Sequence, residues 1–390
     1  MNIQLTSLNH WKILFQSAFF LFFASLTIRR HPRSKRPRVV FYSAVGRPTI
    51  TRLLDQLHAD HTIDWDLVHC SFEQRSQQEI ARYGSRVRWV SPCTWAGAKD
   101  IVRAHAIVTS DRLRTLGIVL HLKGIPFIDV WHGISFKHIK RPGFLRHYEE
   151  VWVSSAYVAE LYEKKLKVPA EKLIVTGFSP SDPLWNLQKN SSERDKTAPN
   201  ILIAPTYTPP NRSRKACPPR FWEDYPFLSQ MAQDLGVRFT IRAHFLDCAD
   251  QRFDPDIPGL TFIPQSVQPD PSPLLADADA LVTDWSSLAF EYLPTGRPTI
   301  FLNNSTNRPQ QFLVTPEMRW GPVVDDSQDF LSALRSFFSS QAIPPTSKES
   351  VSGEATSTFH EVPTGHGSTD RQITRLRGLI GGQFRSAQGN

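Results

Sequence analysis

The sequence predicts an α/β fold in which two Rossmann-like domains face each other across a cleft, preceded by an apolar N-terminal helix. The chain has 390 residues, which suits two domains, and its 40% hydrophobic and 21% charged residues exclude global disorder. Short runs rich in Val and Ile alternate with helical stretches, as is typical of parallel strands covered on both faces. A polar linker, residues 186–199, divides these runs into two series.

The first series assigns residues 37–185 to an N-terminal Rossmann-like domain. Its apolar runs end in Ser, Gly, Asp or Pro, which are residues that terminate strands. The predicted strands lie at 38–44, 65–71, 86–92, 105–111, 125–133, 150–155 and 173–178.

The second series assigns residues 200–341 to a C-terminal domain of the same type, which would bind a nucleotide. Residues 342–369 are rich in Ser, Thr, Pro and Gly and predict a flexible segment, and residues 370–390 predict a closing helix and a tail. Two such domains place a cleft between the carboxyl ends of their sheets, where ligands usually bind. The predicted strands of the second domain lie at 200–207, 237–244, 260–266, 279–287 and 298–304.

Residues 1–36 combine an apolar segment with a basic block. Trp11–Ile28 approaches the roughly 20 residues that cross a bilayer, although Lys12 and Gln16 interrupt it. The basic residues follow the apolar segment, in the reverse order of a secretory signal, and would hold anionic headgroups on the cytoplasmic side. We therefore expect a protein on the cytoplasmic side of the cell membrane, through a signal-anchor or an in-plane helix; an ordinary buried helix is the alternative. The basic residues are Arg29, Arg30, Arg33, Lys35, Arg36 and Arg38.

The composition also narrows the function classes. The net charge is +8, but basic residues are not interleaved with aromatic ones and no zinc-finger spacing is present, so nucleic acid is not an expected partner. The four cysteines form no CxxC pair, which indicates buried thiols rather than disulfides. No Asp-rich motif is evident, so the sequence requires neither a metal ion nor another cofactor.

The stretch ALVTDWSSLAFEY, residues 280–292, ends an apolar strand in two hydroxyls where a helix could begin. Ser286 or Ser287 can cap that helix, whose N–H groups and dipole would form an anion site suited to a diphosphate. Glu291 lies one turn beyond Ser287, where its carboxylate could accept hydrogen bonds from ribose hydroxyls. Taken alone, these residues are explained better by an ordinary N-cap beside a solvated glutamate.

A histidine and a cationic loop follow the predicted strand at 125–133. His132 can act as a general base near neutral pH, and Gly133 lets main-chain N–H groups approach a substrate closely. The loop that follows carries Lys137, Lys140 and Arg141, which suits a phosphorylated acceptor. A loop histidine with satisfied hydrogen bonds beside a solvated basic turn is a common alternative.

Two further predicted strands end in residues that suit a phosphate. Arg242 and His244 alternate onto one side of their strand and together could bind a phosphate group. Pro205 and Thr206 end the first strand of the second domain, where the threonine hydroxyl could reach a base or a phosphate. Each of these pairs is common in proteins and indicates little alone. The functional interpretation depends on their combination at strand ends.

The order of these motifs resembles the CDP-glycerol glycerophosphotransferase family of teichoic-acid synthesis, whose members look like GT-B glycosyltransferases. The resemblance covers roughly residues 100–305. The family's GYPRND reads GFSPSD here, so that Pro180 replaces a phosphate-binding arginine, and Ser135, Phe136, Phe245 and Glu291 also depart from the family motifs. The family's HGTPLK, APT, R-x-H and DYSS-acid motifs appear at 132–137, at Pro205 and Thr206, at Arg242 and His244, and at Ser286, Ser287 and Glu291.

The resemblance implies a transferase that moves glycerol phosphate, or a similar polyol phosphate, from a CDP-activated donor to a lipid-linked acceptor and releases CMP. Such a reaction belongs to the synthesis of teichoic acid or a capsule-like polymer. The resemblance also implies that the N-terminal domain, residues 37–185, binds the acceptor. The implied catalytic residues are His132 and His244; the donor-binding residues are Gly133, Pro205, Thr206, Arg242, His244, Ser286, Ser287 and Glu291; the acceptor-binding residues are Lys137, Lys140 and Arg141.

Two other function classes fit the same residues. A GT-B glycosyltransferase would use the diphosphate site for a nucleotide-sugar and would build a cell-surface polysaccharide, and the replacement of the family arginine by Pro180 favours it. A non-catalytic, membrane-anchored nucleotide-binding protein is the second alternative, against which the presence of His132, Arg242 and both serines argues.

Overall fold

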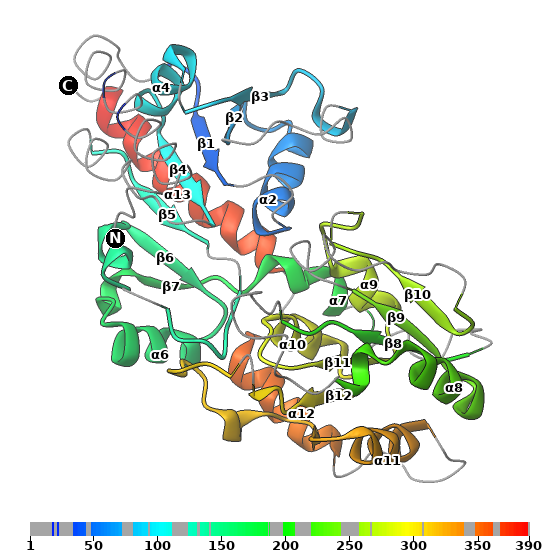
Figure 1. The fold of residues 1–390 in the computed structure, drawn as a ribbon. Helices are drawn as coiled ribbons and strands as arrows, with labels where there is room; N and C mark the ends of the chain where they lie inside the picture. The colour runs from blue at the N-terminus through cyan, green and yellow to red at the C-terminus, as the bar shows by residue number, and fades with distance from the viewer. Residues whose placement is uncertain are drawn as a thin grey trace. The chain divides into compact units, whose positions relative to one another are not determined.

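The computed structural model comprises two α/β units (Figure 1). Unit 1 contains the described residues up to 130, together with 142–179 and 367–388, and unit 2 contains 133–139 and the described residues from 180 to 361. The structure describes residues 18, 22, 34–43, 48–71, 81–92, 94–110, 124–130, 133–139, 142–185, 187, 198–206, 220–242, 257–265, 267–305, 308–338, 348–361 and 367–388.

Unit 1 is built on a parallel sheet whose strands are β1 (Arg38–Tyr42), β2 (Asp66–Cys70), β3 (Val87–Val90), β4 (Ala106–Thr109), β5 (Phe127–Asp129), β6 (Glu150–Val153) and β7 (Leu173–Val175). Each strand lies inside a predicted strand, which confirms the first series. The order is β3-β2-β1-β4-β5-β6-β7, with Val40 opposite both Val68 and Ile107. Strand order therefore reverses between β1 and β4, as in Rossmann-like sheets.

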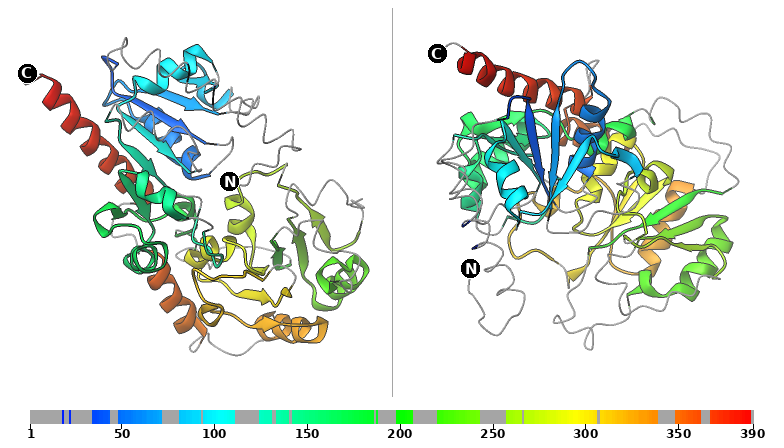
Figure 2. Two further views of the ribbon diagram at one scale, coloured as in Figure 1. Left: turned by 60° about the vertical axis from the view of Figure 1, so that its left-hand side comes forward. Right: turned by 90° about the horizontal axis from the view of Figure 1, so that it is seen from above.

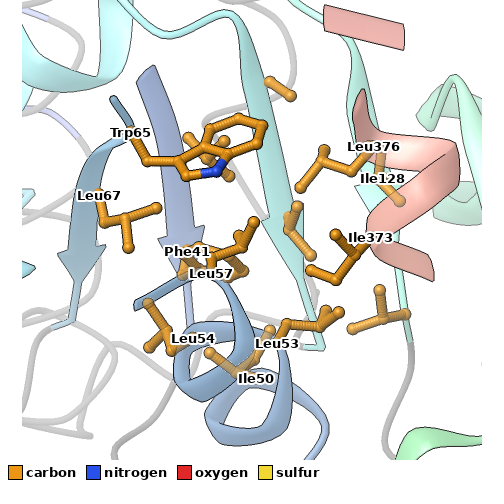
Figure 3. Close-up of a cluster of buried hydrophobic side chains, with 14 of the residues drawn as sticks. Phe41, Ile50, Leu53, Leu54, Leu57, Trp65, Leu67, Ile128, Ile373 and Leu376 are labelled. Carbon is orange, nitrogen blue, oxygen red and sulfur yellow. The ribbon is translucent and has the colours of Figure 1, made fainter. Parts of the chain in front are cut away.

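Two helices that are far apart in the sequence cover one face of this sheet. The helices of unit 1 are α2 (Pro48–Ala59), α4 (Trp95–Val102), α6 (Ala156–Leu166) and α13 (Ser368–Gln388), with the 3₁₀ turns η1 (Pro142–His147) and η2 (Ala170–Lys172). Apolar residues of α2 and α13 recur at helical spacing and meet Phe41 and Ile128 in one buried cluster (Figure 3). The closing helix predicted from residue 370 is thus α13, shown in red in Figure 2, and it completes the core of unit 1.

Unit 2 is built on a second parallel sheet, whose strands are β8 (Asn200–Ile203), β9 (Arg238–Ile241), β10 (Leu260–Phe262), β11 (Ala280–Thr283), β12 (Thr299–Leu302) and β13 (Val323–Val324). The order is β10-β9-β8-β11-β12-β13, so the switch point lies between β8 and β11. The predicted second series is confirmed, and β13 was not predicted.

Helices cover both faces of the second sheet, as the continuous apolar runs require. They are α7 (Asp182–Trp185), α8 (Tyr225–Leu235), α9 (Ser272–Asp277), α10 (Leu288–Tyr292), α11 (Ser327–Phe338) and α12 (Lys348–Phe359), with the 3₁₀ turns η5 (Phe221–Glu223), η6 (Leu293–Thr295) and η8 (Pro316–Met318); η3 (Ser179–Ser181) precedes α7. Ile201 and Ile203 pack with α8 and α11, whereas Leu202 and Ala204 pack with α7, α9 and α10. This alternation along β8 follows from the two-residue period of a strand.

The two units differ in extent from the predicted domains. Residues 133–139 lie within the predicted first domain but belong to unit 2, because Phe136 is buried in the core of that unit. The segment 342–369, for which we expected flexibility, contains α12. Phe359 is buried there, and His360 hydrogen-bonds through Nε2 to the carbonyl of Phe290 at 2.7 Å, so tertiary contacts order a sequence with weak helical signals.

The predicted apolar N-terminal helix lies almost entirely outside the described residues. Within Trp11–Ile28 only residues 18 and 22 are described, and both are helical. In the part of the chain that the structure describes, no helix has the length and hydropathy that a membrane crossing requires. Of the four cysteines, Cys70 is described and is buried.

Candidate functional site

Asp284 joins the loops at the carboxyl ends of β8, β11 and β12. It follows β11 and is fully buried. Its Oδ1 accepts hydrogen bonds from the main-chain N–H and the hydroxyl of Thr206, at 2.7 and 2.6 Å, and its Oδ2 accepts one from Nδ2 of Asn304 at 2.9 Å. A buried carboxylate is stable only with such partners. Pro205 and Thr206 are therefore held at the switch point, where Rossmann-like sheets bind their ligands.

Ser286 and Ser287 form the turn between β11 and α10. The Ser286 hydroxyl accepts a hydrogen bond from the N–H of Leu288 at 3.3 Å, whereas Ser287 occupies the N-cap position without a capping side-chain bond. Among the described residues, none accepts a hydrogen bond from the main-chain N–H of either serine. Two adjacent N–H groups of this kind can bind an oxyanion.

The helix dipole contributes less to this anion site than the sequence suggested. α10 has 5 residues and passes directly into η6, so few peptide dipoles align toward the turn. Attraction of a diphosphate must therefore come from the N–H groups of the turn and from nearby cationic side chains.

Glu291 lies on α10 and contacts Ser287, as the four-residue spacing predicts. The Ser287 hydroxyl donates a hydrogen bond to Oε1 of Glu291 at 3.5 Å. Burial and the negative charge of Asp270 raise the pKa of Glu291 to about 8, against the opposing effects of Arg242 and of the Ser287 hydrogen bond. The carboxyl is therefore mostly neutral at pH 7, and it can both donate and accept a hydrogen bond without repelling a phosphate.

Arg242 follows β9 directly and is buried. Its main-chain N–H donates to the carbonyl of Ile203 at 2.9 Å, and its Nη2 donates to the carbonyl of Pro269 at 3.1 Å. The bond to Pro269 holds the guanidinium in place. Its positive charge lies close enough to Glu291 to oppose the rise in the pKa of that carboxyl. The structure thus brings together Arg242, which we expected at the diphosphate, and Glu291, which we expected at the ribose.

The segment 133–139 is fixed to unit 2 by its main chain. Gly133 has a φ of 128°, in a region that residues with a side chain rarely adopt. Lys137 pairs with Phe312 in an antiparallel bridge, and the N–H of Leu313 donates to the carbonyl of Phe136 at 2.9 Å. The predicted acceptor residue Lys137 is therefore anchored in the nucleotide-type unit.

Phe136 anchors the same segment by its side chain. It is fully buried, with its ring centroid 4.7 Å from that of Phe290, 5.9 Å from that of Phe301 and 6.0 Å from that of Trp285. Aromatic pairs at these distances stabilise a core beyond the area that they bury. Because Trp285 lies between Asp284 and Ser286, the segment packs directly against the turn that carries the two serines.

Four predicted site residues lie outside the described residues and stay predictions: His132, Lys140, Arg141 and His244. The sequence reasoning missed Asp284 and Asn304 as supports of the site. The signal available was an acidic residue at the end of a fully apolar strand, which in a buried position must find donors. In the described ranges, no cluster of His, Cys, Asp or Glu could hold a metal ion.

Comparisons with known proteins agree with this architecture. The model of the CDP-Glycerol:Poly(glycerophosphate) glycerophosphotransferase family matches residues 23–348. A search of curated proteins finds no match. Solved structures of the wall teichoic acid polymerase TagF are similar: one soaked with CDPG has a TM-score of 0.70 and 15% identity over 95% of each chain, and a histidine variant has 0.70 and 14% over 97% of this chain and 100% of its own.

A more distant likeness is to the UDP-GlcNAc 2-epimerase from Methanocaldococcus jannaschii, with a TM-score of 0.55 and 13% identity over 87% of this chain and 98% of that one. At such identities the solved structures show a shared fold, two parallel α/β sheets consistent with a GT-B-like architecture. The family model spans most of the chain. This protein therefore belongs to the CDP-glycerol:poly(glycerophosphate) glycerophosphotransferase family and is a transferase of that type.

Proposed function

We propose that the protein transfers glycerol phosphate, or a similar polyol phosphate, from a CDP-activated donor to a lipid-linked acceptor in teichoic-acid or capsule-like polymer synthesis. Family membership supports the reaction class. The observation that carries the donor assignment is the turn after β11, next to the buried Asp284, where the main-chain N–H groups of Ser286 and Ser287 have no hydrogen-bond acceptor among the described residues.

The donor diphosphate would bind at this turn. The hydroxyls and N–H groups of Ser286 and Ser287 would hold its oxygens, and Arg242, with His244, would balance its charge. A largely neutral Glu291 would bind the ribose hydroxyls, while Pro205 and Thr206 would border the nucleotide. This assignment fits the raised pKa of Glu291, because an ionised carboxylate would repel the adjacent phosphates.

The chemical step would be an in-line displacement at the β-phosphorus. His132 would accept the proton of an acceptor hydroxyl as its oxygen forms a bond to the β-phosphorus. The bond from that phosphorus to the bridging oxygen would break, and CMP would leave with the electron pair. Donors at the turn would stabilise charge on the phosphoryl oxygens.

The acceptor would be anionic and lipid-linked. Lys137, with Lys140 and Arg141, gives the loop after Gly133 a positive charge that suits a phosphate-bearing acceptor. We propose that residues 1–36 bring the protein to the cytoplasmic side of the cell membrane, through the apolar segment and the basic block.

A nucleotide-sugar glycosyltransferase is the second candidate, because Pro180 stands where the family motif has an arginine. Pro180 lies close to the donor unit's helices: its carbonyl accepts a hydrogen bond from Ser272 at 3.5 Å, and the neighbouring Ser181 hydroxyl donates to the carbonyl of Glu291 at 3.4 Å. The substitution thus falls at the edge of the candidate site and could change the group that is transferred.

A donor screen separates the two candidates. Purified full-length protein is incubated with CDP-glycerol, CDP-ribitol, UDP-sugars or CMP-sugars and a lipid-linked acceptor, and the nucleotide product is quantified. We expect CMP release from a CDP-polyol that depends on acceptor; turnover of nucleotide-sugars alone would establish the glycosyltransferase.

The same assay tests the general base. His132→Ala should lower kcat by about 10²–10⁴-fold. His147→Ala, at an exposed residue of η1, is the matched control and should keep full activity. Near-normal turnover of His132→Ala would exclude His132 as the base.

A further inference from the structure

Two arginines of unit 2 lie on the aromatic rings beside the serine turn. The guanidinium carbon of Arg319 is 4.7 Å from the ring centroid of Trp285, and that of Arg308 is 5.8 Å from the ring centroid of Phe312. The Trp285 and Phe312 rings are themselves 5.4 Å apart. Two cationic groups therefore sit on adjoining rings, one of which belongs to the residue immediately before Ser286.

The rings hold this arrangement in place. Trp285 is buried, and its Nε1 donates a hydrogen bond to the carbonyl of Asn304 at 3.0 Å. The guanidinium of Arg319 is also held by a hydrogen bond, which its Nε donates to the carbonyl of Pro316 at 3.1 Å. Stacking on a tryptophan face suits a guanidinium because the ring quadrupole attracts the cation.

The two positive charges are not neutralised by ion pairs. Within the described ranges, neither Arg308 nor Arg319 has a carboxylate at ion-pair distance, and Nη1 of Arg319 is buried without a hydrogen-bond partner. Burial and the charge of Arg308 lower the pKa of Arg319, while Glu317 and Asp325 act on it only from a distance. An anion that binds the pair would therefore stabilise these two like charges.

A third cationic residue borders the pair. Lys137 lies opposite Phe312 in the antiparallel bridge, so their side chains project on the same side of the two paired segments. Arg308 is exposed and Arg319 is half-buried, so the pair is open to solvent at Arg308. The planar N–H fork of arginine matches phosphate oxygens in geometry as well as in charge.

We propose that Arg308 and Arg319 form a phosphate-binding site over the Trp285–Phe312 ring pair, next to the serine turn and bordered by Lys137. Its ligand is the anion of a phosphate ester, which the donor diphosphate and a phosphodiester of the acceptor both contain. The identification of this phosphate ester as part of a substrate rests on the proposed function. The prediction that the two arginines bind a phosphate ester does not depend on it.

The direct test is a calorimetric titration of the full-length protein with glycerol 3-phosphate, with saturating cytidine present to occupy the nucleoside position and leave the phosphate positions open. We expect Arg308→Gln and Arg319→Gln each to raise the Kd at least tenfold. Arg335→Gln removes an equal charge from an exposed position of α11 and should leave the Kd unchanged. Unchanged affinity in both test variants would overturn the proposal. Arg308 is exposed, so we expect Arg308→Gln to fold normally. It therefore tests the proposal even if Arg319→Gln folds poorly.

The source of the phosphate is identified by steady-state kinetics of the same variants. A raised KM for the CDP-activated donor assigns the site to the diphosphate, and a raised KM for the acceptor assigns it to the acceptor chain. Unchanged values of both KM would overturn a role in substrate binding. If the wild-type protein transfers nothing, the proposed function fails while the titration still decides whether the phosphate site exists.

Discussion

Asp284→Asn tests whether a buried carboxylate holds together the loops of the candidate donor site. The wild-type side chain accepts two hydrogen bonds from Thr206, at 2.7 and 2.6 Å, and one from Asn304 at 2.9 Å. Asparagine keeps an acceptor for Thr206 but loses the charge, and its NH₂ group meets the NH₂ group of Asn304. A hydrogen bond to a charged group contributes about 1.5–3 kcal/mol, so we expect the loops to lose local stability of about that size.

Hydrogen exchange followed by mass spectrometry measures this loss of local stability in the loops themselves. A loss of about 1.5–3 kcal/mol should accelerate exchange of the hydrogen-bonded amides of Ala204 and Thr206, after β8, and of Asn303, after β12, by roughly 10- to 150-fold. Asp279→Asn is the matched control at the other end of β11: Asp279 accepts a hydrogen bond from the N–H of Asn200 at 2.8 Å, so exchange should rise there instead. Unchanged exchange in both loops of Asp284→Asn would refute the reasoning.

Three further predictions concern acid–base behaviour, packing and membrane attachment. Burial raises the pKa of Glu291 from 4.5 to about 8, so the stability contributed by its proton is full below pH 4.5 and is lost as pH rises toward 8. Glu291→Gln should therefore be more stable than wild type at pH 8.5, by on the order of a few kcal/mol, and closer to it at pH 5; equal thermal unfolding curves at both pH values would contradict this. Phe136→Ala should destabilise unit 2 by about 3–5 kcal/mol in urea unfolding and Phe136→Leu by less, whereas equal losses would argue against the aromatic core. Deletion of residues 1–30 should release the protein from membranes on carbonate extraction, and undiminished membrane association would contradict an N-terminal anchor.

The strands were predictable because each is a local run of apolar residues with a clear stop. β8, for example, is the run Asn200–Ile203, which is buried throughout and has Pro205 two residues beyond its end. The strand β13 was missed because Val323–Val324 is too short to show a period. Helix α12 was missed because its residues are mostly small and polar, and contacts of Phe359 and His360 with the rest of unit 2 order them.

The site was predictable where it depends on neighbours in sequence and not where it depends on the order of strands. The contact between Ser287 and Glu291 follows from helical spacing alone. The bond between Thr206 and Asp284 joins residues 78 apart, and only the pairing of β8 with β11 brings them together. Phe136 was recognised only as a departure from a family motif, whereas the structure shows that it fills an aromatic core.

The central claim is that the serine turn of unit 2 binds the diphosphate of a cytidine nucleotide. Calorimetric titration of CDP into the wild-type protein and into the Ser286→Ala, Ser287→Ala double variant tests it most directly, with cytidine as the ligand that lacks a diphosphate. The account predicts that the folded double variant binds CDP at least tenfold more weakly, about 1.4 kcal/mol, with no added loss for cytidine. An unchanged Kd for CDP in a folded double variant would contradict it.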